Sequence, residues 1–327
     1  MIEQRELWRI SSLLIFVTNR ERTLLLRTHI DRINTGTPIL IGKFDFSDAY
    51  KSMTMWGHTS AASCICHENI AYIYLRLTLG GSPCPPLWWS MSEINTNLAN
   101  DILARADWDP SRTNSPHCEQ IPKPNILNGN IPFAKALPAN VAVTPLKHGK
   151  VDCYIYNLIP VILHSGYNYE RATNAVPIAT HIIGRPVFPN EPIPWDNLLC
   201  FRKPYGEIQT TEMKIITGWG INTRRFLVFL TEDKQSSCST SIKTIINRGS
   251  STYNDIETLV GHLNHCGNII PLARHFLHLI RGIMRRSAKK KIKISSKEIR
   301  YLHIWKRFLS YAKTGISMNN IVYRSPT

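Results

Sequence analysis

The chain has 327 residues, 43% of them hydrophobic, and a formal net charge of +16 at pH 7. This length can bury one or two cores without disulfides, and the apolar content excludes an intrinsically disordered chain. The excess of Lys and Arg points to an anionic partner, either nucleic acid or an acidic membrane surface. No apolar run approaches the roughly 20 residues needed to span a bilayer, and the N-terminus has no signal-peptide pattern. The sequence therefore predicts an intracellular protein, nuclear or cytoplasmic and not secreted.

Residues 1–35 have the apolar spacing of a helix, and an apolar run that follows predicts a buried strand ending at Asp45. A carboxylate at the end of a core strand is well placed for metal or phosphate chemistry, because a rigid scaffold aims it at an open edge. The alternative is that Asp45 only caps the turn after it.

Residues 63–79 predict a hairpin with its turn at 67–69 and with the apolar run 70–79 as a central strand. A loop rich in Gly and Pro leads into a predicted long helix. Its apolar residues recur every three or four positions, at Leu87, Met91, Ile94, Leu98 and Ile102.

The middle of the chain alternates irregular and regular segments. Residues 108–150 contain seven prolines and little periodicity, which indicates a loop or insertion. Residues 151–163 predict two short strands around a tight turn near 156–158. A helix is predicted over about 167–183, and Pro177 is expected to start or kink it.

Residues 213–219 and 225–230 predict a further hairpin. After residue 236 the composition shifts to helix and charge, with amphipathic helices predicted over 253–286 and 296–312. Pairs of histidines in the first of these helical regions have a spacing that zinc can use, but Pro271 separates the pairs and no HExxH carboxylate accompanies them. Core histidines are therefore the prediction.

Residues 270–310 carry most of the positive charge, with twelve Lys and Arg against the single acid Glu298, or +11. This one-signed charge predicts a phosphate-binding surface. The alternatives are a solvated charged face and, for the run 285–293, a nuclear localisation patch. The cations are Arg274, Arg281, Arg285, Arg286, Lys289, Lys290, Lys291, Lys293, Lys297, Arg300, Lys306 and Arg307.

Four stretches stand out, at Lys43–Tyr50, Leu79–Pro85, Thr217–Arg225 and Leu259–Leu277, and in this order they resemble motifs of the palm and thumb of a reverse transcriptase. Lys43–Tyr50 resembles the first palm motif, whose Asp binds catalytic metal, and Leu79–Pro85 resembles the second motif, F-G-x-S-x-x-P. Thr217–Arg225 resembles the primer-grip hairpin, L-G-[WF]-x-[IV]-x-T-R. Leu259–Leu277 is similar to a thumb segment of long-terminal-repeat and DIRS-type retroelements. The chain is therefore identified as resembling such a palm and thumb, in truncated and degenerate form.

The resemblance assigns expected roles to individual residues. It implies that Asp45 is catalytic and binds Mg²⁺, and that the protein uses no organic cofactor. Two of the residues assigned below have an alternative interpretation: Lys214 as a solvated lysine at a strand edge, and Trp219 as a buried core residue. Template and nucleotide binding are expected at Gly80, Ser82, Pro85 and Lys214, and primer-grip or thumb contacts at Gly218, Trp219, Arg224 and Arg274. The phosphate-binding patch is expected at Arg281, Arg285, Arg286, Lys289, Lys290, Lys291 and Lys293.

One motif of the family is altered. The resemblance implies a metal-binding Y-x-D-D turn, but the matching residues are Tyr154-Ile155-Tyr156-Asn157, so Tyr156 and Asn157 stand where two aspartates belong. Two Mg²⁺ ions need hard oxygen ligands, and Asp45 alone leaves most of their charge unneutralised. Asp152 lies four residues before Tyr156, roughly 13 Å along a strand, which is too far to substitute. The sequence therefore predicts that polymerisation is lost.

The predicted fold is α+β: a right-hand polymerase palm, with an antiparallel sheet and helices on one face, followed by an all-helical thumb. Residues 1–38 are expected to precede the palm, 39–235 to form it with an insertion at 108–150, and 236–327 to form the basic thumb. The predicted partner is RNA or an RNA–DNA duplex, without a membrane, and the oligomeric state stays open. The alternative is a non-enzymatic nucleic-acid-binding or structural protein that acts through its basic C-terminal helices.

Overall fold

The computed structural model describes a little over two thirds of the chain. Contacts group the chain into two compact units. One contains Thr37–Leu127 and Thr144–Glu212, and the other contains Met1–Gly36, Asn128–Val143 and Met213–Thr327. The predicted helix over 1–35 lies outside the described residues, and the predicted boundary at 235/236 stays a prediction. The described residues are 36–47, 49–55, 57–62, 64–77, 84–107, 109, 115–127, 129–135, 148–165, 168–184, 199–200, 205–267, 269–270, 273–286 and 291–319.

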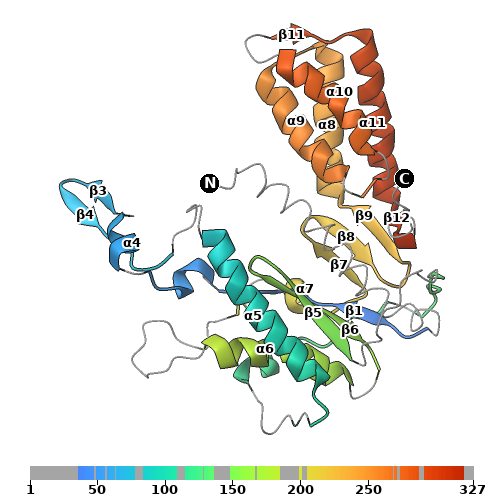
Figure 1. Ribbon diagram of the computed structural model, residues 1–327. Helices are drawn as coiled ribbons and strands as arrows, with labels where there is room; N and C mark the ends of the chain where they lie inside the picture. Colours follow the sequence, from blue (N-terminus) through green and yellow to red (C-terminus); the bar gives the residue numbers. More distant parts are fainter. Residues whose placement is uncertain are drawn as a thin grey trace. The chain divides into compact units, whose positions relative to one another are not determined.

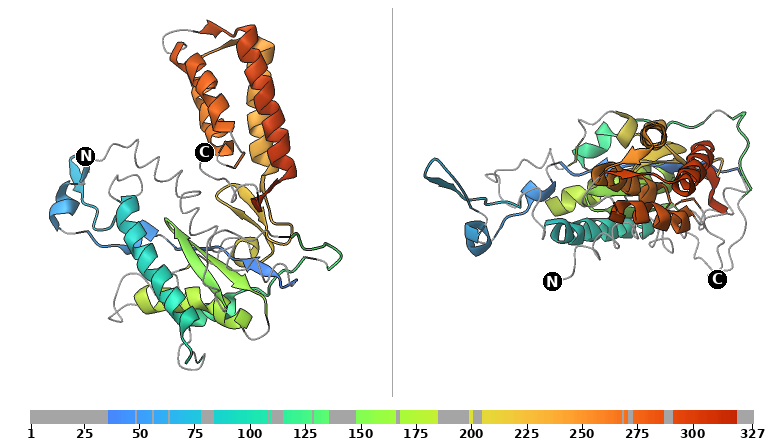
Figure 2. Two further views of the ribbon diagram at one scale, coloured as in Figure 1. Left: turned by 45° about the vertical axis from the view of Figure 1, so that its right-hand side comes forward. Right: turned by 90° about the horizontal axis from the view of Figure 1, so that it is seen from above.

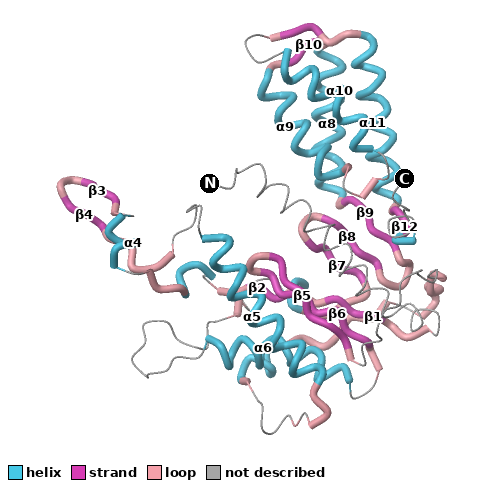
Figure 3. The backbone as a smooth tube through the Cα atoms, in the orientation of Figure 1, coloured by secondary structure: helices cyan, strands magenta, loops and turns pink. Residues whose placement is uncertain are grey.

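The first unit is built on a four-stranded antiparallel sheet (Figure 3). Strand β6 (Asn157–Leu163) lies at its centre and is buried along its whole length. It pairs with β5 (Gly149–Tyr154) on one side, and with β1 (Ile39–Ile41) and then β2 (Phe44–Asp45) on the other. The run of Leu, Ile and Val in β6 fits a central strand that is covered on both faces. The predicted pair of strands in 151–163 is confirmed, but the turn lies at residues 155 and 156 rather than near 156–158.

Helices α5 (Cys84–Ala104) and α6 (Asn168–Gly184) pack side by side against this sheet (Figure 1). Both helices are as predicted, although Pro177 lies inside α6 rather than at its start. The predicted inner face of α5 is right at Ile102, which is 4% exposed, but it is shifted nearer the start of the helix. Leu87 and Ile94 are 47% and 53% exposed, while Trp88, Ser92, Asn95, Thr96 and Ala99 are buried.

The reason for the shift is that small and polar side chains on α5 bind the strand backbone. The Asn100 side chain donates to the carbonyl of Val151 and accepts from its amide, at 3.0 and 2.9 Å. Asn95 donates to Thr180 of α6 at 2.9 Å. Such bonds satisfy buried polar groups at the contact between the helix and its neighbours, and apolar periodicity does not reveal them.

The segment between β2 and α5 is exposed. Strands β3 (Ile65–His67) and β4 (Ile70–Tyr72) form the predicted hairpin, and every residue of both strands is exposed. Both views of Figure 2 show this hairpin apart from the four-stranded sheet. The prediction of a central strand over 70–79 is therefore wrong, because an apolar β-branched run alone does not reveal whether partners cover it. The short helices of the unit are η1 (Ala49–Ser52), α4 (Gly57–Ala62), η2 (Pro116–Gln120) and α7 (Tyr205–Ile208).

In the second unit, residues 213–230 form a meander rather than the predicted single hairpin. Strands β7 (Met213–Ile216), β8 (Trp219–Asn222) and β9 (Leu227–Leu230) pair in sequence order. The first turn falls at Thr217–Gly218, where both residues have positive φ, 50° and 84°. That pattern is a type I′ turn, which fits the twist of a two-residue hairpin. The turn splits the run 213–219 into two strands.

Four helices follow, packed side by side (Figures 1 and 2). Their buried faces include Ile256, Leu259, Leu263 and Ile280, and Trp305 is fully buried. The C-terminal segment is not all-helical: β10 (Ser250–Ser251) pairs with β11 (Ile292–Lys293), and β12 (Ile316–Ser317) returns to pair with β9. The helices are α8 (Glu232–Arg248), α9 (Tyr253–Cys266), α10 (Ala273–Arg286) and α11 (Ser296–Thr314).

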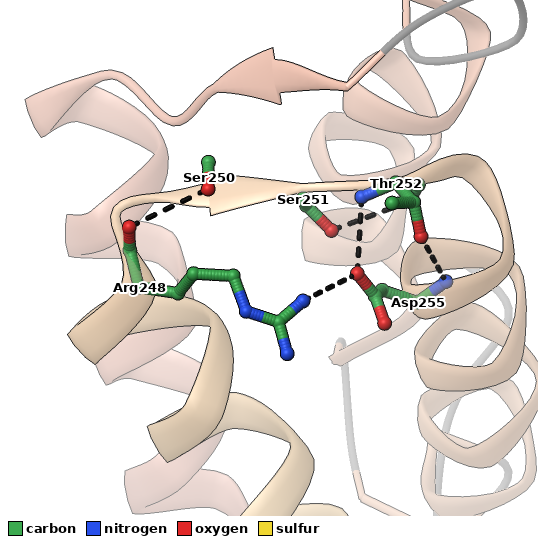
Figure 4. A network of polar contacts seen from close by, with 5 residues as sticks. All are labelled: Arg248, Ser250, Ser251, Thr252 and Asp255. Carbon is green, nitrogen blue, oxygen red and sulfur yellow. Dashed lines mark hydrogen bonds and ion pairs between the residues drawn. The ribbon is translucent and has the colours of Figure 1, made fainter.

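The link between α8 and α9 shows why these helices end and begin where they do (Figure 4). Gly249 takes the left-handed conformation after α8, at φ 61°. Thr252 then caps α9: its hydroxyl accepts from the amide of Asp255, whose carboxylate accepts from the amide of Thr252 at 3.0 Å. The same carboxylate binds Arg248 at 3.0 Å. The bond from the Thr252 amide lowers the pKa of Asp255 most. Burial opposes this, and the bonds with the Thr252 hydroxyl and with Arg248 lower the pKa further.

The separate antiparallel sheets and helices confirm the α+β class. Within the described part of the chain, no helix is both long enough and apolar enough to cross a membrane.

Candidate functional site

Asp45 lies directly beside the turn that the sequence marks as altered. Strand β2 pairs with β6 so that Asp45 is opposite Asn157, and Asn157 is also opposite Tyr154 across the β5–β6 turn. The amide of Phe46 donates to the carbonyl of Tyr156 at 3.2 Å. The geometry therefore brings together the three positions that the resemblance to a polymerase active site requires.

The turn itself is held in an unusual conformation. Ile155 has φ of 54°, which β-branched residues rarely adopt, and its carbonyl accepts a hydrogen bond from the Ser92 hydroxyl of α5. Positive φ at the first central residue only is the pattern of a type II′ turn, where glycine is the usual residue. Helix α5 thus fixes the tip of the hairpin.

Aromatic rings lie around the site. Phe46 and Tyr50 both meet the ring of Trp88, at centroid distances of 5.0 and 6.3 Å. Burial raises the pKa of the Tyr50 phenol, and the neighbouring groups of Tyr156 and Cys84 raise it further. Tyr156 is 40% exposed. A neutral phenol at this position contributes no negative charge to the site.

The charge of Asp45 is balanced by the protein. Its carboxylate is buried, at 4% exposure, and its Oδ2 atom lies 3.8 Å from Nζ of Lys43. The same ammonium group is 3.0 Å from Oε2 of Glu207 on α7. Because a buried charge is costly without a counter-charge, this arrangement stabilises Asp45 in the folded chain.

These side chains do not fit a pair of Mg²⁺ ions. Octahedral Mg²⁺ needs several hard oxygen donors, and the strand pair offers one carboxylate, one neutral amide and a nearby ammonium group. In the ranges that the structure describes, no three or more His, Cys, Asp and Glu gather in a way that could hold a metal. Asp48, three residues after Asp45 in the same sequence motif, lies outside those ranges.

The other predicted nucleotide contacts differ in what the structure describes. Gly80 and Ser82 lie outside the described residues, whereas Pro85 lies in the first turn of α5 and is exposed. Lys214 on β7 is only 4% exposed, so the alternative of a solvated strand-edge lysine is wrong. Its role in nucleotide binding stays a prediction.

Two of the predicted primer-grip residues, Trp219 and Arg224, are buried within their own unit. Trp219 is 2% exposed and stacks on the His265 ring of α9, with centroids 4.6 Å apart and planes 15° apart. This favours the core alternative for Trp219. Arg224, at 4% exposure, lies over the Phe133 ring at 4.7 Å and donates to the carbonyl of Ile131 at 3.4 Å. Gly218 supplies the positive φ that the turn needs.

The basic side chains of α10 are exposed to solvent. Arg274, Arg281 and Arg285 follow one another at steps of seven and four residues, which places them along one side of the helix. They span eleven residues, about 16 Å. Burial and the neighbouring charge of Arg281 lower the pKa of the Arg274 guanidinium, which stays cationic at neutral pH.

The rest of the predicted patch is divided. Arg286 forms an ion pair with Glu298, the single acid of the segment. Lys291 and Lys293 are exposed, while Lys289 and Lys290 lie outside the described residues. Arg281 and Arg285 are exposed and, among the residues that the structure describes, form no ion pair of the kind that Arg286 forms with Glu298.

Two charged residues at Asp45 were missed by the sequence analysis. Lys43 precedes Asp45 by two positions, a spacing that places side chains on one face of an extended chain, so its approach could have been inferred. Glu207 lies 164 positions from Lys43, and no sequence pattern connects them.

The fold that these elements define is reverse-transcriptase-like. The similarity is to two solved structures of the foamy viral protease–reverse transcriptase, each at 12% identity. In the complex with double-stranded DNA the TM-score is 0.51, covering 85% of this chain and 36% of that one. In the complex with an RNA/DNA hybrid it is 0.50, covering 84% and 27%. This chain thus spans about a third of the length of those proteins. No family model matches the sequence, and the search of curated proteins finds no match.

Proposed function

We propose that this chain is a reverse-transcriptase-like nucleic-acid-binding protein of retroelement type that has lost polymerisation. Its palm is the β1–β2–β5–β6 sheet with α5 and α6, and its thumb is the four-helix segment. The observation that carries the proposal is the pairing of Asp45 with Asn157 beside the Tyr156 turn. This is the strand arrangement of a polymerase site with one carboxylate left.

The loss of polymerisation follows from charge. Two-metal phosphoryl transfer needs carboxylates to hold the ions that activate the primer hydroxyl and neutralise the leaving group. Asp45 is buried beside Lys43, and neither Tyr156 nor Asn157 supplies a negative charge. Asp45 therefore serves as a structural partner of Lys43, and Mg²⁺ is not held as it is in an active polymerase.

Primer extension on an RNA template with Mg²⁺ or Mn²⁺ tests this part. We expect no extension above that of the Asp45→Asn variant. Synthesis that depends on Asp45 would overturn the inactive assignment. Gain of extension in the double variant Tyr156→Asp/Asn157→Asp would support the account of how activity was lost.

Nucleic-acid binding is assigned to the basic side of α10. Two features support it: the exposure of Arg281 and Arg285, and the use of Glu298 by Arg286 rather than by them. Arginine on a rigid helix suits phosphate oxygens, because its donors form a planar fork. RNA or an RNA–DNA duplex is the partner that the palm-like sheet favours.

Binding of a fluorescent RNA–DNA hybrid across a range of salt concentrations tests this assignment. The double variant Arg281→Gln/Arg285→Gln should weaken binding about ten- to a hundredfold and reduce the slope of log affinity against log salt by about 2. The matched control is Lys51→Gln/Lys243→Gln, which removes the same charge from exposed sites elsewhere. An equal loss of affinity in both double variants would show that net charge, rather than the position of the two arginines, determines binding.

The second candidate is a nucleic-acid-binding or structural protein with no palm site. The same exposed arginines favour it. A Tyr156→Ala variant separates the two: weakened hybrid binding with unchanged stability favours a contact at the palm turn, and unchanged binding favours the helices alone.

A further inference from the structure

The interface between α8 and α9 holds two thiols in contact. Sγ of Cys238 and Sγ of Cys266 are 3.9 Å apart, although the residues are 28 positions apart in the sequence. Both side chains are buried, at 2% and 1% exposure. A disulfide needs about 2.05 Å between the sulfurs, so the two cysteines are free thiols.

The two thiols are not equivalent. The hydrogen bond between the two thiols lowers the pKa of Cys238, burial opposes this, and the charge of Lys234 lowers the pKa further. The same hydrogen bond, together with burial, raises the pKa of Cys266. The first proton therefore leaves Cys238, and the thiolate that forms is the nucleophilic form of cysteine.

The pair adjoins the β7–β8 turn. His265, next to Cys266 in α9, stacks on Trp219. A side chain at Gly218 would come within 3.1 Å of Cε of Lys234 and 3.5 Å of Nε2 of His265. Any displacement of the end of α9 thus reaches the turn that carries the predicted primer-grip residues.

We propose that Cys238 and Cys266 form a reversible redox site, in which a small peroxide converts the two thiols into a disulfide between α8 and α9. The Cys238 thiolate attacks one peroxide oxygen, so that an S–O bond forms, the O–O bond breaks and the leaving hydroxide takes a proton. Cys266 sulfur then displaces the hydroxyl of the sulfenic acid, giving an S–S bond and a second water. Two thiols lose two electrons and two protons, and hydrogen peroxide becomes two waters.

The bond has a structural consequence at the turn. Closing the sulfurs from 3.9 Å to about 2 Å draws the C-terminal end of α9 toward α8. His265 moves with it and changes its stacking on Trp219. The environment of Trp219 on β8 therefore depends on the redox state of the pair.

The test is peroxide treatment of the full chain carrying Cys64→Ser/Cys66→Ser, which removes two exposed thiols that would otherwise react first. We expect peptide mapping to find one cross-linked pair, Cys238 with Cys266, lighter by two hydrogens and reversed by dithiothreitol. Adding Cys238→Ser or Cys266→Ser should abolish it. Trapping with dimedone should label Cys238 in the Cys266→Ser variant at least tenfold more than Cys266 in the Cys238→Ser variant.

Absence of the cross-link from the folded protein, while the unfolded protein forms it, would overturn the proposal. Equal dimedone labelling of the two single variants would overturn the assigned order of the steps. Oxidation should also shift the tryptophan emission of the protein but not of its Trp219→Phe variant. The proposal does not depend on nucleic-acid binding, so a protein that fails to bind hybrid still gives a clear result.

Discussion

The Asp45 site and the basic side of α10 both carry charge, but in opposite environments. Asp45 is 4% exposed and faces the Lys43 ammonium, whereas Arg281 and Arg285 are exposed on a helix surface. A buried charge must be balanced inside the protein, while an exposed one is balanced by water and salt. The difference teaches that the carboxylate of the sheet has become part of the fold, and that the cations of the helices are available to a partner.

The largest expected effect comes from adding a second carboxylate to the sheet. Asn157→Asp places an acid directly opposite Asp45, where both side chains are buried, and should lower the free energy of unfolding by about 3 kcal/mol at pH 7. Denaturant titration with and without millimolar Mg²⁺ measures this. We expect Mg²⁺ to stabilise the variant and to leave the unsubstituted chain unchanged.

The matched control is Asn157→Leu, which has a similar size and no charge and should cost less. If Asn157→Asp were as stable as the unsubstituted chain without Mg²⁺, Asp45 would not be the buried carboxylate described above.

Removal of the Lys43 charge should cost about 2–3 kcal/mol. In Lys43→Met the Asp45 carboxylate stays buried without this counter-charge, while in Asp45→Asn the lysine keeps Glu207 at 3.0 Å and the cost is smaller. Thermal unfolding of the two variants measures the difference. Lys51→Met is the control, because Lys51 is exposed. The reverse order of the two costs would show that Glu207, rather than Asp45, determines where Lys43 lies.

On the helices, pH should act through His265. Burial, followed by the charges of Lys234 and His262, lowers the pKa of His265 to about 4. In the unfolded chain the His265 imidazole binds a proton near pH 6.5. The contribution of the neutral, buried imidazole to the free energy of unfolding is therefore fully present above that pH and is lost as the pH falls toward 4. The ring is partly exposed, so the loss should be on the order of 1–2 kcal/mol.

The measurement is the difference in unfolding free energy between the protein and its His265→Phe variant from pH 7 to 4. Acidic groups contribute equally to both proteins and cancel. A difference that does not change over this interval would contradict the lowered pKa.

The smallest effect is expected at the cap of α9. Thr252→Ala removes the hydroxyl that accepts from the Asp255 amide and should cost about 1 kcal/mol. Ser310→Ala, at an exposed position within α11, should change stability by less than about 0.5 kcal/mol. Chemical denaturation compares the two. Equal effects would show that the capping box in Figure 4 adds nothing to the packing of the helices.

The sequence predicted elements best where apolar spacing and packing agree. The series Ile256, Leu259 and Leu263 is buried as its period requires. The spacing failed for α5, whose inner face uses Ser92 and Asn95, and for β4, whose apolar residues are exposed. In both places the deciding partners come from distant parts of the chain.

For the candidate site, the motif at Lys43–Tyr50 and the altered turn were enough to predict that Asp45 lies beside Asn157. The environment of these residues was not predictable. The pairing of Lys43 with Glu207 depends on how α7 packs, and the contact of Cys238 with Cys266 depends on the register of two helices. Local patterns do not encode such distances.

The short strand β12 has a consequence for the architecture of the helical segment. The chain leaves the sheet after β9, forms the four helices and returns at β12, where Ile316 pairs with Val228. The helical segment therefore begins and ends at neighbouring strands of one sheet. A segment of this kind behaves as an inserted module: the chain can be cut at one of its exposed loops, or the helices replaced by another helical segment, without separating the two strands.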